Sequence, residues 1–295
     1  KMHLIIILYS LFASIFTLQK ETLKYAEPLF LIGIRMTISG FILILHEITN
    51  KNLIKIKLKH IPLFIILSLL NIYLTNILEI WGMSYITSSK TCLIYSLSPF
   101  ITAIFSYLTI KEKLSIKKKI GLIIGFIGLI PIIYTQSQEE INIGKFFILT
   151  LPEISIIGAV ICNTLGWITL KKIIIKNYSP IIANGYSMLL GGTLILIHSY
   201  TFKEMWINFP IYNINIFIFY NILTGIISNI ICYNLFGHLL KKYTVTFMSF
   251  AGLMTPIFAS CFGIIFHNEI ITWHFYASNI IFTIGLIIYH NEELK

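Results

Sequence analysis

The chain has 295 residues, of which 57% are hydrophobic and only 12% are charged, and its mean hydropathy is +0.85. Soluble domains carry roughly 25% charged residues, so this composition excludes a soluble globular enzyme, and the abundance of apolar residues excludes a disordered chain. The net charge of +10 does not indicate nucleic-acid binding, because the lysines stand in short runs between apolar stretches, as the cytoplasmic loop charges of membrane proteins do.

Ten apolar stretches are long enough to cross a bilayer, which takes about 20 helical residues. Their apolar residues run continuously instead of alternating, which predicts an all-α polytopic membrane protein and not a β-barrel. In chain order, the expected transmembrane helices cover residues 3–19, 28–46, 61–83, 90–110, 118–135, 146–170, 180–199, 214–237, 245–266 and 270–290. The connections are too short for a separate soluble domain.

The lysines favour one side of this arrangement. With the N-terminus inside, sixteen lysines fall in cytoplasmic segments and five fall on the opposite side. The positive-inside rule then predicts a multi-pass membrane protein with both termini in the cytoplasm.

An internal repeat relates the two halves. Three pairs of residues share an offset of 157 positions: Pro99 with Pro256, Glu112 with Glu269, and Gly128 with Gly285. We therefore expect one repeat over residues 1–140 and a second over residues 141–295. Because each half holds five spans, an odd number, the second half must enter the membrane inverted, with a substrate site between the halves.

The residues of this repeat resemble a known family. In the first copy these are Ser88 and Ser89, Ser98 to Phe100, Lys111 to Leu114, and Gly121 to Gly128; in the second, Thr246 to Pro256, Glu269 and Gly285. Both copies look like the EamA domain of the drug/metabolite transporter superfamily. The resemblance implies ten helices in two inverted five-helix halves, and movement of a small metabolite by alternating access.

Ionisable residues inside a span are costly and mark candidate sites. Arg35, about seven residues into the second span, could hold a carboxylate or phosphate, or could snorkel to the outer interface or cap helix carbonyls. Glu153 follows Pro152 about seven residues into the sixth span, where it could meet a cationic group or a proton, or pair with Arg35. Glu79, near the outer end of the third span, could contact substrate or reach only the headgroups.

Other candidate residues carry amide, hydroxyl or indole groups, which need hydrogen-bond partners in the apolar interior of the membrane. These are Tyr73, Asn76, Tyr95, Asn163, Trp167, Tyr186, Asn229 and Tyr233. Their aromatic faces can stack on a planar ligand or attract a cation, while the alternative is interhelical hydrogen bonding and interfacial belts. Pro99 and Pro256 are expected to kink the fourth and ninth spans around a central cavity.

The predicted function is secondary transport of a small polar or amphiphilic metabolite. No Walker A, HExxH or GxSxG sequence occurs, and the cysteines lack metal-ligand spacing, so no catalytic residue, cofactor or metal is expected. S-adenosylmethionine fits the candidates, with its carboxylate on Arg35, its cationic groups on Glu153 and its adenine on an aromatic face. Related members of the resembled superfamily import this metabolite.

Several alternatives stay open. Export of amino acids or drugs is allowed by the same resemblance. From other classes, an intramembrane lipid-modifying enzyme would need clustered catalytic groups, and a channel would need a pore without two-sided gating. A small-molecule metabolite and the lipid bilayer are the expected partners, and a homodimer is left open.

Overall fold

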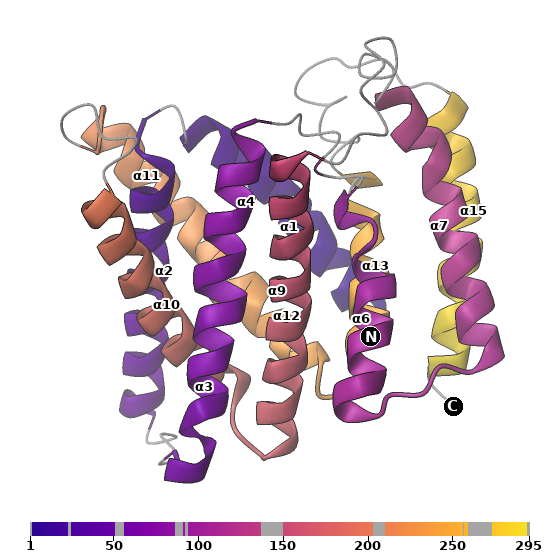
Figure 1. Cartoon of the computed structure of the whole chain (residues 1–295), viewed down its shortest axis with the longest axis horizontal. Helices are drawn as coiled ribbons and strands as arrows, with labels where there is room; N and C mark the ends of the chain where they lie inside the picture. Colours follow the sequence, from indigo (N-terminus) through magenta and orange to yellow (C-terminus); the bar gives the residue numbers. More distant parts are fainter. Residues whose placement is uncertain are drawn as a thin grey trace.

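The computed structural model describes residues 2–22, 25–50, 56–85, 91, 94–136, 150–202, 210–255, 257–258 and 273–293. Within these ranges the chain forms helices, connecting turns and one isolated antiparallel bridge between Ala26 and Ile211. The helices stand side by side as ten rods, which confirms the expected all-α fold (Figure 1).

The first five rods come from the first half of the chain. They are α1 (Met2–Thr22); α2 (Pro28–Thr49); a third rod made of η1 (Leu58–His60), α3 (Ile61–Leu67), η2 (Ser68–Leu74) and α4 (Thr75–Met83); α6 (Ser98–Ile110); and α7 (Ile116–Gln136).

The second half supplies the other five rods. They are α9 (Leu151–Ile175); α10 (Pro180–Phe202); an eighth rod made of α11 (Ile214–Thr224), η3 (Gly225–Cys232) and α12 (Tyr233–Leu239); α13 (Val245–Ala251) with η4 (Gly252–Met254); and α15 (Trp273–Glu293). Among the described residues, five helices are long and apolar enough to cross a membrane: Pro28–Thr49, Leu58–Met83, Leu151–Ile175, Pro180–Phe202 and Ile214–Leu239.

One expected helix boundary is wrong, and another expected span is interrupted. In the fourth span, Thr91, Ile94 and Tyr95 are helical, a turn at Ser96 and Leu97 follows, and α6 then begins with Pro99 in its first turn. A proline there costs no hydrogen bond, so the interruption lies just before Pro99. The sixth span begins at Leu151 and not at residue 146, because a capping box fixes its first turn. Pro256 lies outside the described residues.

Hydrogen bonds between rods fix their directions. The backbone N–H of Glu27, just before α2, donates to the carbonyl of Pro210, just before α11, at 2.9 Å. Because α11 begins at the end where α10 finishes, α2 and α10 run in opposite directions. Likewise α7 begins where α15 ends, since Lys118 and Glu293 form an ion pair at 2.5 Å. Equivalent helices of the two halves therefore run antiparallel.

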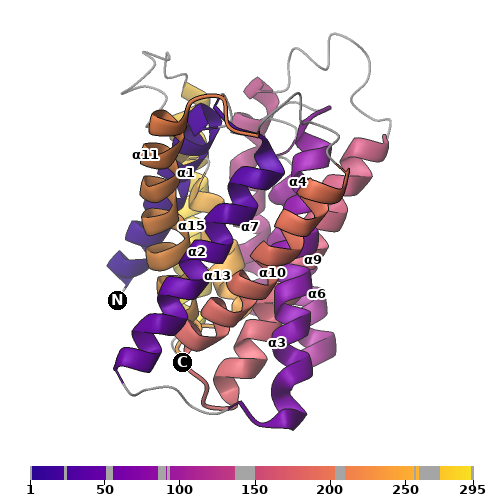
Figure 2. The same cartoon turned by 90° about the vertical axis from the view of Figure 1, so that its left-hand side faces the viewer.

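The packing partners follow the same inverted symmetry. α2 packs along α10, its equivalent, and α7 along α15. α1 packs against α11 and η3 of the second half, while its equivalent α9 packs against η2 and α4 of the first. Figure 2 shows α1, α11 and α2 side by side. Each half thus completes the other, as an inverted repeat requires.

Glycines allow the equivalent helices to approach closely. A Cβ at Gly40 of α2 would lie 2.4 Å from the backbone nitrogen of Leu189 in α10. A Cβ at Gly285 of α15 would lie 2.5 Å from the backbone nitrogen of Gly125 in α7. Only a residue without a side chain fits at these two crossings.

A π-helical segment interrupts both the third and the eighth rod. η2 begins at Ser68 and η3 at Gly225, which are 157 positions apart, the offset that the sequence repeat predicts. The wider π turn leaves backbone carbonyl groups without their α-helical partners, and polar side chains donate hydrogen bonds to them. Thr75 donates to the carbonyl of Leu70, and Asn76 donates to that of Ile72, both at 2.6 Å.

Most of the described lysines lie at one end of the molecule. This is the lower end in Figure 1, where α3, α7, α10 and α13 begin. The lysines at this end are Lys57, Lys59, Lys111, Lys113, Lys117, Lys118, Lys119, Lys171, Lys172, Lys176, Lys241 and Lys242. At the opposite end, the described helices carry Lys20.

Candidate functional site

Arg35 lies inside the helix bundle. It is seven residues into α2, which places it about 10 Å from the start of that helix at 1.5 Å per residue, and it is only 5% exposed. This burial excludes a side chain that snorkels to the interface. Its Nε and Nη1 atoms have no hydrogen-bond partner among the residues that the structure describes. Buried guanidinium nitrogens without an acceptor are costly and mark a candidate site for an anion.

The eighth rod presents a polar stripe to α2. Asn221, Gly225, Asn229 and Tyr233 recur at a spacing of four residues, which keeps them on one side of the rod. A Cβ at Gly225 would lie 3.5 Å from Cγ of Arg35, so the two helices touch here.

The asparagine amides of this stripe are incompletely paired. Asn229 is fully buried, and its Nδ2 donates to the sulfur of Met36 at 3.2 Å. The Oδ1 atoms of Asn229 and of Asn221 have no partner within the described part of the chain. Sequence reasoning identified Asn229 and Tyr233 but missed Asn221, which the four-residue spacing could have revealed.

Aromatic side chains continue the site toward α9. The ring of Trp167 lies 4.1 Å from that of Phe236 and 5.2 Å from that of Tyr233, between ring centroids. Tyr233 lies near enough to Arg35 and Glu79 to be affected by their charges. The structure thus brings together four of the predicted site residues, Arg35, Trp167, Asn229 and Tyr233, with Glu79 at the margin.

Glu79 is held by a second aromatic residue. The hydroxyl group of Tyr95 donates to Oε2 of Glu79 at 2.6 Å, which joins the segment before α6 to α4. Both side chains are half-buried, so the carboxylate is tied to the protein and does not simply reach for headgroups.

Glu153 lies apart from Arg35, contrary to the expected position deep in a span. It is the third residue of α9, where its carboxylate accepts hydrogen bonds from the backbone N–H and, at 2.9 Å, from the hydroxyl group of Thr150. This is a capping box, in which the carboxylate also favours the positive end of the helix dipole. The first-turn position explains both the burial of Glu153 and the charge in apolar sequence.

The remaining predicted residues contact other helices. Tyr73 hydrogen-bonds Nδ1 of His198 in α10 at 3.1 Å. The ring of Tyr186 packs edge-on against Phe64, with centroids 6.1 Å apart. These contacts match the interhelical alternative that the sequence left open.

Asn163 likewise joins two rods. Its Oδ1 accepts from Nδ2 of Asn71 at 3.3 Å, which links α9 to η2. A Cβ at Gly166 would lie 2.6 Å from the same Nδ2 atom, so α9 and η2 are packed closely around this amide pair.

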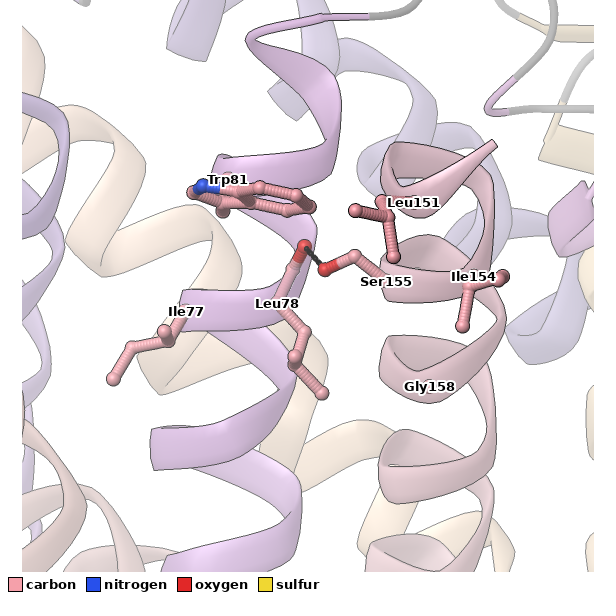
Figure 3. A pocket seen from close by; sticks show the side chains of 7 residues that line it. All are labelled: Ile77, Leu78, Trp81, Leu151, Ile154, Ser155 and Gly158. Carbon is pink, nitrogen blue, oxygen red and sulfur yellow. Dashed lines mark hydrogen bonds between the residues drawn. The ribbon is translucent and has the colours of Figure 1, made fainter. Parts of the chain in front are cut away.

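A shallow cavity of about 500 Å³ lies on the outside of the bundle between α4 and α9. Figure 3 shows its lining residues, Ile77, Leu78, Trp81, Leu151, Ile154, Ser155 and Gly158. The hydroxyl group of Ser155 donates to the carbonyl of Leu78 at 2.8 Å, and Leu151 is 72% exposed. This apolar, outward-facing hollow contains none of the predicted site residues and offers a polar solute little to bind.

Charged residues also meet at the lysine-rich end. The Lys118 and Glu293 side chains are 13% and 2% exposed, and Oε1 of Glu293 accepts from the backbone N–H of Thr244 at 2.5 Å. Nearby, in the connection between α6 and α7, burial raises the pKa of the Glu112 carboxyl, and the charge of Glu293 adds to this rise. At the opposite end, a 2.7 Å hydrogen bond to Glu27 raises the pKa of the Tyr212 hydroxyl.

The described residues contain no group of three or more His, Cys, Asp or Glu side chains that could hold a metal ion. The arrangement at α2 and the eighth rod is instead one of hydrogen-bond donors, amide oxygens and aromatic faces. Such a set can bind a charged organic solute without changing it.

Comparison with known proteins identifies similar chains. The EamA-like transporter family matches residues 1–134 and 150–290. An S-adenosylmethionine/S-adenosylhomocysteine transporter of Chlamydia trachomatis serovar L2 is 33% identical over 291 residues, covering 96% of this chain and 86% of that one. The protein of the same description from Chlamydia muridarum is 32% identical over 290 residues, covering 96% and 89%.

More distant similarities extend over most of the chain. An uncharacterized transporter of Bacillus subtilis is 23% identical over 83% of this chain and 81% of its own. A protein of known crystal structure shares the fold with a TM-score of 0.74 over 99% of this chain and 97% of its own, at 11% identity.

Proposed function

Because the chain belongs to the EamA-like transporter family, we propose that it is a secondary transporter that imports or exchanges S-adenosylmethionine across the bacterial inner membrane. The observation that carries this proposal is the buried Arg35, whose Nε and Nη1 atoms have no acceptor in the described structure. The relatives from Chlamydia, similar over nearly the whole chain, are described as transporters of S-adenosylmethionine and S-adenosylhomocysteine.

The chemistry of the site suits such a substrate. The carboxylate of S-adenosylmethionine binds Arg35 through charge-assisted hydrogen bonds. Its adenine ring and its sulfonium group lie against Trp167 and Tyr233, since aromatic faces stack on planar rings and attract cations. Glu79, at the margin of the site, supplies negative charge toward the same cationic group. The proposed activity is transport and involves no catalytic step.

The two halves supply the transport mechanism. We propose that residues 1–140 and 141–295 are the two repeat units, with the boundary outside the described residues. Arg35 belongs to the first unit, and Asn229, Tyr233 and Trp167 belong to the second, so the site lies between them. Rocking of one unit against the other then exposes the substrate to the two sides in turn.

The orientation follows from the distribution of lysines. We propose that the lysine-rich end faces the cytoplasm, together with both termini, because cytoplasmic loops of membrane proteins are enriched in Lys and Arg. A fluorescent protein that folds only in the cytoplasm, fused to the C-terminus, is expected to fluoresce. A homodimer remains a prediction, which the mass of the detergent-solubilised protein tests.

Uptake into proteoliposomes tests the function. Labelled S-adenosylmethionine should enter saturably, and unlabelled S-adenosylhomocysteine inside the vesicles should accelerate its entry, as exchange by a carrier requires. Arg35→Gln should weaken binding by about ten- to a hundredfold, the value of one or two charged hydrogen bonds. Glu153→Gln, which alters a capping residue away from Arg35, is the control and should retain uptake.

Uptake no greater than in empty liposomes would overturn the proposal. Exchange of amino acids but not of S-adenosylmethionine would favour the alternative amino-acid carrier. Entry that is unaffected by substrate on the far side would instead indicate a channel.

A further inference from the structure

Two unpaired amide oxygens accompany the unpaired Nε and Nη1 atoms of Arg35. Among the residues that the structure describes, the Oδ1 atoms of Asn221 and Asn229 have no hydrogen-bond partner, and both residues are more than nine-tenths buried, at 7% and 0% exposure. Buried amide oxygens are almost always hydrogen-bonded in folded proteins. Two such exceptions on one stripe, beside an unpaired cation, indicate a ligand that is absent from the isolated chain.

Arg35 and Asn221 lie at similar depth, and Asn229 lies deeper along the same rod as Asn221. α2 and α11 begin at the same end of the bundle, as the hydrogen bond between Glu27 and Pro210 shows, and they run in the same direction. Arg35 and Asn221 are each seven residues from the start of their helix, about 10 Å along it. Asn229 lies two turns beyond Asn221, and its amide reaches back to Met36, the neighbour of Arg35.

Gly225 keeps the space between the two asparagines open. It stands one turn from each asparagine. A Cβ at this position would lie 3.5 Å from Cγ of Arg35 and 3.6 Å from Oγ of Ser39. The backbone of the eighth rod therefore approaches the arginine directly, with one asparagine on either side of the contact along the rod.

The unpaired groups define what can satisfy them. A guanidinium only donates hydrogen bonds, and an amide oxygen only accepts them. A carboxylate or phosphate alone would pair with Arg35 but would leave both asparagine oxygens unsatisfied. An amine alone would pair with the oxygens but would face the positive charge of Arg35. A group that joins an anion to a cationic donor satisfies all of them.

We propose that Arg35, Asn221 and Asn229 form a subsite for the free α-amino acid end of the substrate. The α-carboxylate binds the guanidinium of Arg35, and the α-ammonium group donates to the two Oδ1 atoms. This inference rests on the proposed function, because the ligand it describes is the transported substrate. It adds that a substrate must keep both its α-carboxylate and its α-ammonium group.

Ligand competition with the intact wild-type protein provides the first test. Binding to the detergent-purified full chain is measured for two matched pairs. S-adenosylhomocysteine is compared with 5′-methylthioadenosine, which lacks the amino acid end, and S-adenosylmethionine with its decarboxylated form, which lacks only the carboxylate. We expect the first member of each pair to bind at least tenfold more tightly than the second. Equal binding within both pairs would overturn the subsite while leaving the proposed function intact.

Two variants provide the second test. Asn221→Leu and Asn229→Leu remove an unpaired acceptor without much change in volume. Each should weaken S-adenosylhomocysteine binding about tenfold or more, leave 5′-methylthioadenosine binding unchanged, and leave the melting temperature of the ligand-free protein unchanged or raised. Asn234→Leu is the matched control on the same rod, because its amide already donates to the carbonyl of Ile230 at 2.8 Å, and it should retain binding.

The two proposals fail in different ways. Unchanged S-adenosylhomocysteine binding in both leucine variants would overturn the subsite. Weaker binding of all nucleosides together with a lower melting temperature would also overturn it, since that result assigns the amides a structural role. Binding of free amino acids such as methionine, but of no S-adenosyl compound, would retain the subsite and refute S-adenosylmethionine as the substrate.

Discussion

Replacement of Gly40 by alanine tests how closely α2 and α10 pack. The new methyl carbon would lie 2.4 Å from the backbone nitrogen of Leu189 and 2.7 Å from the carbonyl oxygen of Gly185. Non-bonded atoms prefer a separation of about 3.5 Å or more. Both obstacles are backbone atoms of a helix, so no side-chain rotation relieves them, and α2 must move away from α10 by roughly 1 Å.

The expected loss of stability follows from two opposing effects. Overpacking of this kind costs about 1–3 kcal/mol, and the rigid backbone obstacle favours the upper value. Alanine gains up to about 1 kcal/mol over glycine in a helix. The net loss is therefore about 2 kcal/mol, which lowers the melting temperature by roughly 4–8 °C for a chain of this size class.

Thermal unfolding of the detergent-purified protein, followed by circular dichroism, measures this loss. Gly158→Ala is the matched control, because its methyl group would meet only the flexible end of Leu78, at 3.3 Å. That variant should melt at or slightly above the wild-type temperature, since it gains helix propensity. If Gly40→Ala melts together with Gly158→Ala, the close approach of α2 and α10 is wrong.

Three further substitutions address the charged residues. Glu153→Ala removes the capping box and should cost about 1 kcal/mol of stability, while the KM for S-adenosylmethionine uptake stays unchanged; a raised KM would return Glu153 to the binding site. Glu293→Ala leaves Lys118 buried without its counterion and should cost about 3–5 kcal/mol of stability in denaturation experiments. The double variant Lys118→Met and Glu293→Leu should recover much of that loss. No recovery in the double variant would count against the ion pair. Burial raises the pKa of the Glu112 carboxyl in the folded state. The stability of the wild-type protein should therefore fall as pH rises from the unfolded-state pKa through the raised value. Glu112→Gln removes this ionisation and should raise the melting temperature at neutral pH but not below about pH 4. Parallel melting curves of the two proteins from pH 4 to 8 would contradict that assignment.

The helical architecture could be predicted because the membrane imposes it on the sequence. A transmembrane helix needs an unbroken run of apolar residues. The charged residues between such runs therefore mark the ends of the helices in the sequence. The repeat offset read from Pro99, Glu112 and Gly128 also holds for η2 and η3, since a duplicated helix retains its register even when its side chains change.

The contacts of individual polar residues could not be predicted in the same way. Glu153 stands in apolar sequence that does not show where the helix begins, so its role as a capping residue emerged only with the start of α9 at Leu151. The pairing of Asn163 with Asn71 depends on which rods are neighbours, and spacing along one helix does not contain that information. Arg35 could be identified from the sequence because a charged residue inside an apolar span is rare.

The matching π segments give the two halves the same local helix geometry. A π turn holds one residue more than the α-helix around it, and such turns are frequent at functional sites. Ser68 and Gly225 open the two segments 157 positions apart, although the residues that follow them, Leu69 and Ile226, differ. The same widened turn is thus compatible with different side chains, so the backbone of these two rods is more alike than their sequences.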